Sequence, residues 1–356
     1  MEIQIRKAQR KKAKLRLGIS APSGGGKTMS SLLLAYGITD DWEKIGLIDT
    51  EAGSGELYVG ETAETPEGPV KIGEYNYIRI EPPFTVAKYL AAIRAFEKSG
   101  VEIIIEDSLS HAWAGAGGLL DKQGKEADRT GNSYTAWRNV TPEHNALVDA
   151  ILQSPCHHIS TMRSKTEYVL ETNDKGKQVP KKVGMAPVQR DGMEYEYTVF
   201  MDIDSKHIAY ASKDRTNLLK SEQFMISPAT GKMLREWLEK GVDEIKALEE
   251  AIDKCQSMDE LFLLKSEKIN TMWHSMNAQE RKIIENKYKY RKAIENIKAA
   301  KDAAGLLDVT GGEEHRALLA DLDGTDMKSD LMNLSTKRYE LLTTAEDVNQ
   351  KLNNAE

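Results

Sequence analysis

The amino-acid sequence predicts an α/β fold, in which a mostly parallel β-sheet is flanked by helices, carries a β-rich extension at its edge and is followed by an all-helical carboxyl-terminal region. Two observations predict this fold. Short apolar runs alternate with helical patterns up to about residue 240, which is typical of parallel strands joined by helices. The apolar runs are continuous, as expected of strands that are buried on both faces.

The elements of the sheet follow one another along the chain. Strands are predicted at residues 15–20, 44–49, 75–80, 101–107 and 157–162, and helices at residues 28–38, 85–100 and 134–153. The helix at 85–100 has apolar residues at helical spacing and closes on a glycine. The strand at 101–107, VEIIIED, ends in two acids, so carboxylates are expected at the carboxyl end of a buried strand.

The pattern becomes β-rich between residues 164 and 212. The flanks of residues 173–176, Asn-Asp-Lys-Gly, favour strands, and this central stretch is a hairpin signal. We therefore expect a β-hairpin insertion at about residues 164–196. Further strands, expected at 195–203 and 207–212, complete the extension of the sheet.

The chain is expected to divide into a basic amino-terminal arm (1–13), an α/β core (14–240) and a helical region (241–356). In the helical region, apolar residues recur at helical spacing, near heptad positions in the last segment. The stretch LLDVTGGEEH, at 306–315, predicts a flexible hinge.

Composition limits the classes of function. The net charge is −7, so any nucleic-acid contact must come from local basic patches, of which the amino-terminal arm is the clearest. That arm is either solvated or a nucleic-acid contact. No apolar run is long enough to span a bilayer, and no signal-peptide core opens the sequence, which predicts a cytoplasmic protein without membrane contact. Two distant cysteines, Cys156 and Cys255, fit a reducing compartment.

The stretch LRLGISAPSGGGKT, at 15–28, predicts a phosphate-binding loop between a strand and a helix. Glycines let backbone N–H groups point inward, a helix begins at the loop, Lys27 suits the outer phosphates and the Thr28 hydroxyl suits Mg²⁺. The consensus has glycine where this chain has Ala21. The residues expected to bind nucleotide are Pro22, Ser23, Gly24, Gly25, Gly26, Lys27, Thr28 and Met29.

Two acids at nearby strand ends are expected to complete this site. Asp107 is predicted to hold Mg²⁺ together with Thr28. Glu51, which follows the strand at 44–49, is predicted to polarise the attacking water and accept its proton. Glu106 is the alternative base.

The order APSGGGKT, LIDTE and IIIEDS resembles the RecA-like branch of P-loop ATPases. More narrowly, with STMRSKTEY and YASKDRT, the chain is similar to phage-encoded AAA/RecA-like nucleotide-binding proteins of recombination modules. The resemblance covers roughly residues 14–240 and not the helical region. It implies a RecA-like core, ATP and Mg²⁺ as cofactors, and the cytoplasm of a bacterial host.

The resemblance also implies a site that is shared between subunits. Lys213 and Arg215 match a Lys-x-Arg pair that reaches the γ-phosphate of a neighbouring subunit, which requires a homo-oligomeric ring or filament. Arg163, at the tip of the strand at 157–162, is expected to sense the state of the nucleotide.

The segment between Arg163 and Arg190 lies where RecA-like proteins carry a loop that contacts DNA. Clustered lysines suit sequence-independent contact with the phosphates of single-stranded DNA. The residues expected to bind DNA are Lys175, Lys177, Lys181, Lys182 and Arg190.

Three functions are compatible with these features. The first is an oligomeric ATPase that acts on single-stranded DNA in recombination, annealing or repair. The second is a slow nucleotide switch or loader, whose helical tail recruits a partner such as a single-strand-binding protein. The third is a small-molecule kinase, against which the Lys-x-Arg pair, the β-rich extension and the long helical tail count.

Overall fold

The computed structural model describes residues 7–172, 178–219 and 222–353, and it divides into a unit that ends at Gly241 and a unit that begins at Val242. In its described part, the first unit holds one large sheet and one small hairpin. The strands of the large sheet are β1 (Arg16–Ala21), β2 (Ile45–Asp49), β5 (Asn76–Arg79), β6 (Ile103–Asp107), β7 (His157–Thr172), β8 (Gln178–Pro187), β9 (Val199–Ile203), β10 (Ile208–Asp214) and β11 (Phe224–Met225). The small hairpin joins β3 (Thr62–Thr65) to β4 (Gly68–Lys71).

The order of strands in the large sheet is β11-β10-β9-β1-β7-β6-β2-β5, and β8 pairs with β7 outside this row. From β9 to β5, every pair of neighbours is parallel. The pairs of β10 with β9, of β11 with β10 and of β8 with β7 are antiparallel. The predicted α/β fold with a mostly parallel sheet and a β-rich edge is therefore confirmed.

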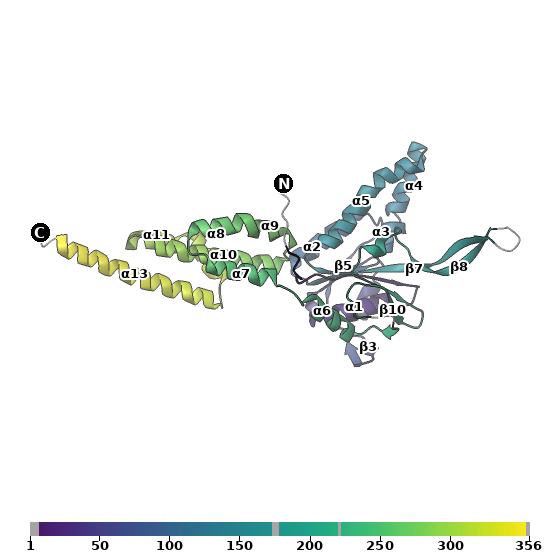
Figure 1. Cartoon of the computed structure of the whole chain (residues 1–356), viewed down its shortest axis with the longest axis horizontal. Coiled ribbons are helices and arrows are strands. Elements are labelled where there is room, and N and C mark those ends of the chain that lie inside the picture. The colour runs from purple at the N-terminus through teal and green to yellow at the C-terminus, as the bar shows by residue number, and fades with distance from the viewer. Residues whose placement is uncertain (1–6, 173–177, 220–221, 354–356) are drawn as a thin grey trace. The chain divides into compact units, whose positions relative to one another are not determined.

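Helices cover both faces of the sheet (Figure 1). Those of the first unit are α1 (Lys27–Thr39), α2 (Val86–Ser99), α3 (Ser110–Ala114), α4 (Leu119–Thr130), α5 (Ser133–Gln153) and α6 (Pro228–Leu238). One core layer packs α1 and α6 on the sheet, and the other packs α2, α3 and α5 on the opposite face.

Strand β6 shows how these two layers divide the side chains of the sheet. Ile103 and Ile105 belong to the layer of α1, whereas Ile104 belongs to the layer of α2 and α5. Because successive side chains of a strand point to opposite faces, Asp107 falls on the α1 face and Glu106 on the other.

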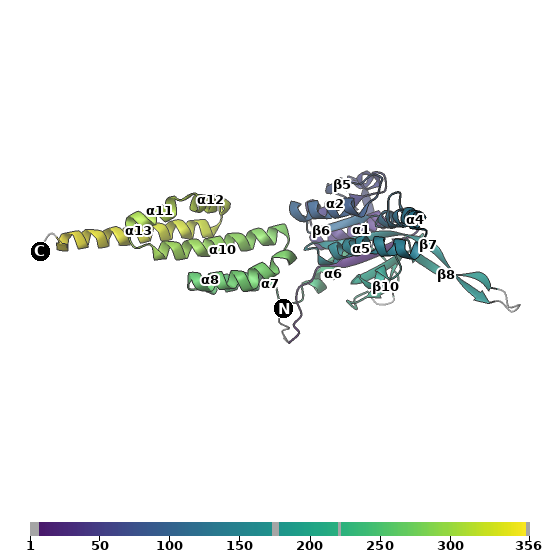
Figure 2. The ribbon, with the colours of Figure 1, turned by 90° about the horizontal axis from the view of Figure 1, so that it is seen from above.

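Strand β7 is much longer than the strand predicted at 157–162. It continues to Thr172 and pairs along that length with β8, so the two strands extend beyond the rest of the sheet in both views of the chain (Figure 2). The predicted hairpin signal at 173–176 lies outside the described residues. The strand expected to start at residue 195 begins instead at Val199, because Met193–Tyr195 form a 3-10 turn.

The described part of the amino-terminal arm lies against α6. The guanidinium of Arg10 is 4.5 Å from the ring centre of Trp237, and the backbone N–H of Ala13 donates to the carbonyl of Leu238 at 3.2 Å. Arg10 and Ala13 therefore contact α6, but all the described residues of the arm, 7–13, are exposed, so the choice between a solvated arm and a nucleic-acid contact stays open.

The second unit is helical throughout its described residues. Its helices are α7 (Glu244–Lys254), α8 (Met258–Leu264), α9 (Asn270–Met272), α10 (Ala278–Ala299), α11 (Ala303–Gly311), α12 (Glu313–Asp321) and α13 (Asp326–Asn353), with a π-helical turn (Lys265–Ile269) between α8 and α9. The stretch predicted as a hinge, 306–315, is helical except at Gly312, which lies between α11 and α12. The helices reach this glycine because Leu306 and Leu318 are buried in one cluster with Leu331, and Asp302 caps α11 by accepting from the N–H of Gly305 at 2.7 Å. No helix among the residues described here is both long and apolar enough to cross a membrane.

Candidate functional site

The loop between β1 and α1 requires glycine at several positions. Gly24 and Gly26 have left-handed backbones, with φ of 74° and 83°, which side chains disfavour. A Cβ on Gly25 would lie 2.9 Å from that of Ala21, and one on Gly26 would lie 2.7 Å from Nδ1 of His207. Since Gly26 has no side chain to cap α1, the first N–H groups of the helix are left to bind an anion.

Beside this loop lies a cavity of about 440 Å³, a size typical of small-molecule sites. Its lining residues come from four separate segments of the chain: Ser23, Gly24, Gly26, Lys27, Thr28, Glu51, Ser54, Tyr58, Asp107, Arg163 and Ser164. Five of the eight residues predicted to bind nucleotide thus line the cavity. The other three do not line it: Pro22 and Gly25 belong to the loop, and Met29 packs against the cluster of Leu33.

The side chain of Lys27, the first residue of α1, folds back onto the start of the phosphate loop. Its Nζ donates to the carbonyls of Ala21 at 3.3 Å and Pro22 at 3.2 Å. Burial lowers the pKa of Lys27, and the nearby carboxylates of Asp107 and Glu51 oppose this shift. The ammonium is therefore near enough to both carboxylates to interact with their charges, while its hydrogen bonds go to the two loop carbonyls.

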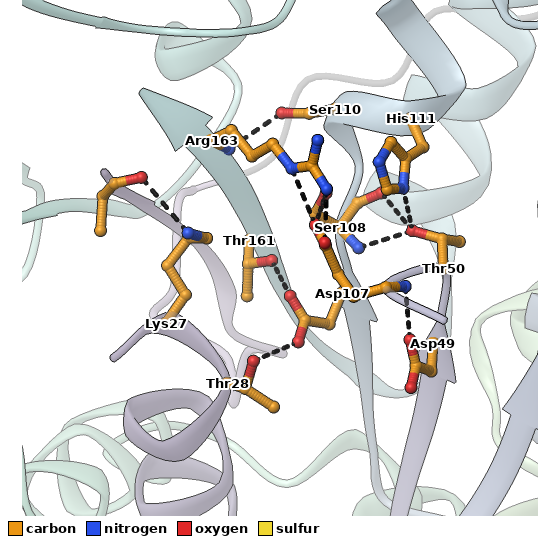
Figure 3. A network of polar contacts seen from close by, with 12 residues as sticks. Lys27, Thr28, Asp49, Thr50, Asp107, Ser108, Ser110, His111, Thr161 and Arg163 are labelled. Carbon is orange, nitrogen blue, oxygen red and sulfur yellow. Dashed lines mark hydrogen bonds and ion pairs between the residues drawn. The ribbon is translucent and has the colours of Figure 1, made fainter. Parts of the chain in front are cut away.

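Asp107 is almost fully buried, and two hydroxyls hold its carboxylate (Figure 3). Thr28 Oγ1 donates to one oxygen at 2.5 Å and Thr161 Oγ1 to the other at 2.5 Å. Burial raises the pKa of Asp107 despite these two hydrogen bonds, and a cation beside the carboxylate would oppose that shift. A hydroxyl and a carboxylate at this distance are the hard oxygen donors that Mg²⁺ prefers, so the residues present fit the predicted metal.

Asp49 shapes the segment that carries Glu51. One of its oxygens accepts from the N–H of Glu51 at 2.5 Å. The other accepts from the N–H of Gly55 at 2.9 Å and from the hydroxyl of Tyr77 at 2.8 Å. Because both oxygens are used in this way, Asp49 acts as a fixed support for the turn after β2.

The carboxylate of Glu51 faces the cavity and is paired with Arg163. Arg163 Nε donates to Glu51 Oε1 at 3.0 Å, a second guanidinium nitrogen donates to Oε2, and Ser108 Oγ donates to Oε1 at 3.1 Å. Burial raises the pKa of Glu51, but the bonds and charge of Arg163, with smaller effects of His111 and Ser108, bring it below its ordinary value. The predicted base and the predicted sensor are thus in direct contact.

A second polar cluster ties β2 to β6 beneath Glu51. Thr50 donates its N–H to the carbonyl of Asp107 at 2.7 Å, and its hydroxyl accepts from the N–H of Ser108 at 2.8 Å. The same hydroxyl lies 2.8 Å from Nδ1 of His111, whose ring stacks on Phe84. These contacts fix the distance between Glu51 and Asp107.

Glu106 cannot replace Glu51 as the base. It is fully buried on the opposite face of the sheet, where it bonds with Nδ1 of His158 at 2.5 Å and with Ser160 Oγ at 2.7 Å. The alternative assignment is therefore wrong, because adjacent residues of β6 point to different layers.

Lys213 and Arg215 lie far from this cavity within one chain. The N–H of Arg215 donates to the carbonyl of Thr198. The N–H of Thr198 in turn donates to the carbonyl of Arg16, which is the first residue of β1. The phosphate loop follows the other end of β1, five residues and about 16 Å further along the strand. Both cations donate to the carbonyl of Tyr195, Arg215 at 3.2 Å.

The residues predicted to bind DNA are only partly described. Lys175 and Lys177 lie outside the described residues, and Lys181 and Lys182 are described as backbone positions of β8 paired with β7. Arg190 is half-buried in the segment that follows β8, so it lies at the base of the hairpin.

The sequence prediction missed several residues at the site, among them Ser54 and Ser164 of the cavity lining, and three others are instructive: Thr161, Tyr58 and His207. Thr161 could have been found as the neighbour of a buried acid on the next parallel strand. Tyr58 and His207 have no such signal, because each is brought to the loop by a turn whose path only the folded chain defines.

A family model described as an AAA domain matches residues 13–227, more than half of the chain. No curated protein matches the sequence of this chain.

Proposed function

Because the chain belongs to the AAA domain family, we propose that its cavity binds and hydrolyses ATP. One observation carries this proposal. Lys27, Thr28, Asp107 and Glu51 come from three separate segments and line a single cavity at the start of α1. This combination provides a cation, a metal-binding pair and a base around one phosphate loop.

In the proposed complex, the phosphates lie on the free N–H groups at the start of α1, and Lys27 turns from the loop carbonyls to the outer phosphates. Thr28 and Asp107 would hold Mg²⁺, which supplies positive charge to the phosphate oxygens. Tyr58 and Ser54 close the side of the cavity next to the turn that follows Glu51.

Hydrolysis then needs one proton transfer by the chain's own residues. The water oxygen forms a bond to the γ-phosphorus as the bond to the bridging oxygen of ADP breaks, and Glu51 accepts a proton from the water. Glu51 suits this role because its backbone is fixed by Asp49 and its carboxylate faces the cavity.

We further propose that the protein is a homo-oligomer that acts on single-stranded DNA in recombination, annealing or repair. Two features support this. The position of Lys213 and Arg215 suits action on a neighbour's nucleotide better than on their own. The β7–β8 hairpin continues directly from the strand that carries Thr161 and Arg163, which gives a ligand of the hairpin a route to the cavity.

A slow nucleotide switch or loader is the second candidate, and one observation favours it. Glu51 is paired with Arg163, so its oxygens are occupied and hydrolysis from this arrangement is slow. The helical second unit would then recruit a protein partner.

Calorimetry with ATP and Mg²⁺, followed by phosphate release with and without an oligonucleotide, tests these proposals. Release stimulated by DNA supports the DNA-dependent ATPase. Tight binding with negligible turnover, even with DNA, supports the switch, and transfer to an acceptor instead of water supports a kinase. If no nucleotide binds in the presence of Mg²⁺, the proposed function is wrong. Size determination with and without an ATP analogue tests the oligomer.

A further inference from the structure

In the proposed complex, the guanidinium of Arg163 can bind either of two anionic groups, the carboxylate of Glu51 or a phosphate of the nucleotide. It makes a bidentate ion pair with Glu51, and it also lines the same cavity as Lys27 and Thr28. Guanidinium matches carboxylate and phosphate with the same planar geometry. A phosphate bound in the cavity therefore competes with Glu51 for the same donors.

The position of Arg163 brings this competition within reach of the phosphate loop. In the parallel pairing of β1 with β7, Arg163 lies directly opposite Ala21, the last strand residue before the loop. The terminal phosphate is the part of a triphosphate that lies closest to the strand ends carrying Asp107 and Glu51 in the proposed complex.

The backbone of Arg163 is fixed, while its side chain has room to turn. Its N–H donates to Ser110 Oγ at 2.9 Å, and its carbonyl accepts from the N–H of Val188 at 2.6 Å. The side chain is 48% exposed, against 23% for that of Glu51. A change of partner therefore needs only a side-chain rotation.

Glu51 stays in place when Arg163 leaves it. Ser108 still donates to Oε1, and Asp49 still holds the N–H of Glu51. The freed oxygen Oε2 then faces the cavity and is open to accept a proton from water.

We propose that Arg163 exchanges its partner from Glu51 to the terminal phosphate of a bound nucleoside triphosphate, so that the triphosphate itself releases the base. This inference rests on the proposed function. A diphosphate, which lacks that phosphate, leaves the pair intact. Arg163 is thus a positioning residue that also recognises the triphosphate.

The first test compares the affinities of a non-hydrolysable ATP analogue and of ADP, each with Mg²⁺. Arg163→Ala should weaken the analogue about 10- to 100-fold, as expected for a charged hydrogen-bonding group, and change ADP by less than about 2-fold. Arg163→Lys, which keeps the charge but loses the planar fork, should fall between the two. Arg79→Ala is the matched control, because Arg79 pairs with Glu81 at 3.3 Å outside the cavity.

Equal loss of affinity for the analogue and ADP in Arg163→Ala would show a merely structural arginine and overturn the exchange. In that case nucleotide still binds, so the proposed function stands. If the unchanged protein binds neither nucleotide, the proposed function fails and the exchange fails with it.

The second test uses Glu51→Gln, which keeps the shape of the side chain and removes its charge. The analogue should bind several-fold more tightly, because no carboxylate competes for Arg163, and ADP should bind as before. Crystal structures should show the Arg163–Glu51 pair kept with ADP and broken with the analogue. A pair that persists with the analogue contradicts the proposal.

Discussion

The charged residues at the two ends of the parallel strands are held in different ways. We call the side where these strands end the carboxyl edge and the side where they begin the amino edge. At the carboxyl edge, Asp107, Glu51 and Arg163 bind one another or neighbouring hydroxyls through side chains from separate strands. At the amino edge, Lys213 and Arg215 share one backbone carbonyl, that of Tyr195. Lys213 also donates to the carbonyl of Glu194 at 3.1 Å. The carboxyl edge is thus held by side chains from separate segments, whereas the cations of the amino edge bind only backbone carbonyls of one short segment among the hydrogen bonds of the described residues.

In the proposed function, the carboxyl edge acts within one chain and the amino edge acts on a neighbouring copy. The carboxyl edge carries the groups that the proposed function assigns to phosphate binding. The amino edge lies about 16 Å from the phosphate loop along β1, so in the proposed function its cations would act on the nucleotide of another copy.

The largest effect is expected at the carboxyl edge. Lys27→Ala should remove measurable turnover and weaken ATP binding at least about 10-fold, since a charged hydrogen-bonding group at the phosphates is lost. Isothermal calorimetry and phosphate release measure both. Lys44→Ala is the control, because Lys44 pairs with Glu102 at 3.1 Å at the amino edge. Normal ATP binding by Lys27→Ala would remove the phosphate loop from the proposal.

The next effect tests whether the amino edge acts across a subunit boundary. Lys213→Ala should lower turnover by about 10³- to 10⁵-fold if the residue is a finger for a neighbour's phosphate. Mixing Lys213→Ala with Glu51→Gln subunits should restore part of the activity, because some interfaces then combine an intact cavity with an intact finger. Lys98→Ala, which changes an exposed lysine at the end of α2, should change little. No recovery at any mixing ratio would contradict a shared site.

A smaller effect is expected from the base. Glu51→Gln should keep ATP bound and lower turnover by about 10²- to 10⁴-fold, because no group then accepts the proton of the water. Single-turnover measurements separate this loss from binding. Glu56→Gln is the control, since Glu56 is exposed in the same turn. Normal turnover by Glu51→Gln would leave this site without a base, because Glu106 faces the other layer.

The smallest effect concerns the packing of the amino edge. Burial raises the pKa of the Cys156 thiol to about 12, which leaves roughly 10³-fold less thiolate than a free cysteine has at pH 8. In a Cys255→Ser background, Ellman's reagent should label Cys156 far more slowly in the native than in the unfolded protein. ATP should not change the rate. Rapid labelling with ATP would mean that this edge opens, against the fixed geometry described above.

The phosphate loop could be predicted because its determinants are adjacent in the chain. The left-handed backbone at residues 24 and 26 requires glycine, and Lys27 and Thr28 follow directly at the start of α1. The strand that ends at Asp107 was also predictable from its apolar run. The contact between Glu51 and Arg163 was not, because it joins residues 112 positions apart and depends on how β2, β6 and β7 are ordered.

In the helical unit, the prediction from neighbouring residues was less accurate. Glycines at 311 and 312 suggested a hinge, but the buried leucines on both sides extend the helices up to these residues. Only Gly312 interrupts the helices there, because packing between residues distant in sequence outweighs local propensity in the rest of the stretch.

The sequence by itself determined that a strand, a glycine-rich loop and a helix would form a phosphate cradle, because that geometry depends on local backbone freedom and on groups within one turn of helix. Only the tertiary structure decided that Arg163 pairs with Glu51 and on which edge Lys213 and Arg215 lie, and it showed why Asp107, as predicted, and not Glu106 enters the cavity. The physical reason is that side chains alternate between the faces of a strand, and the face that meets α1 is set by pairing between strands far apart in the chain.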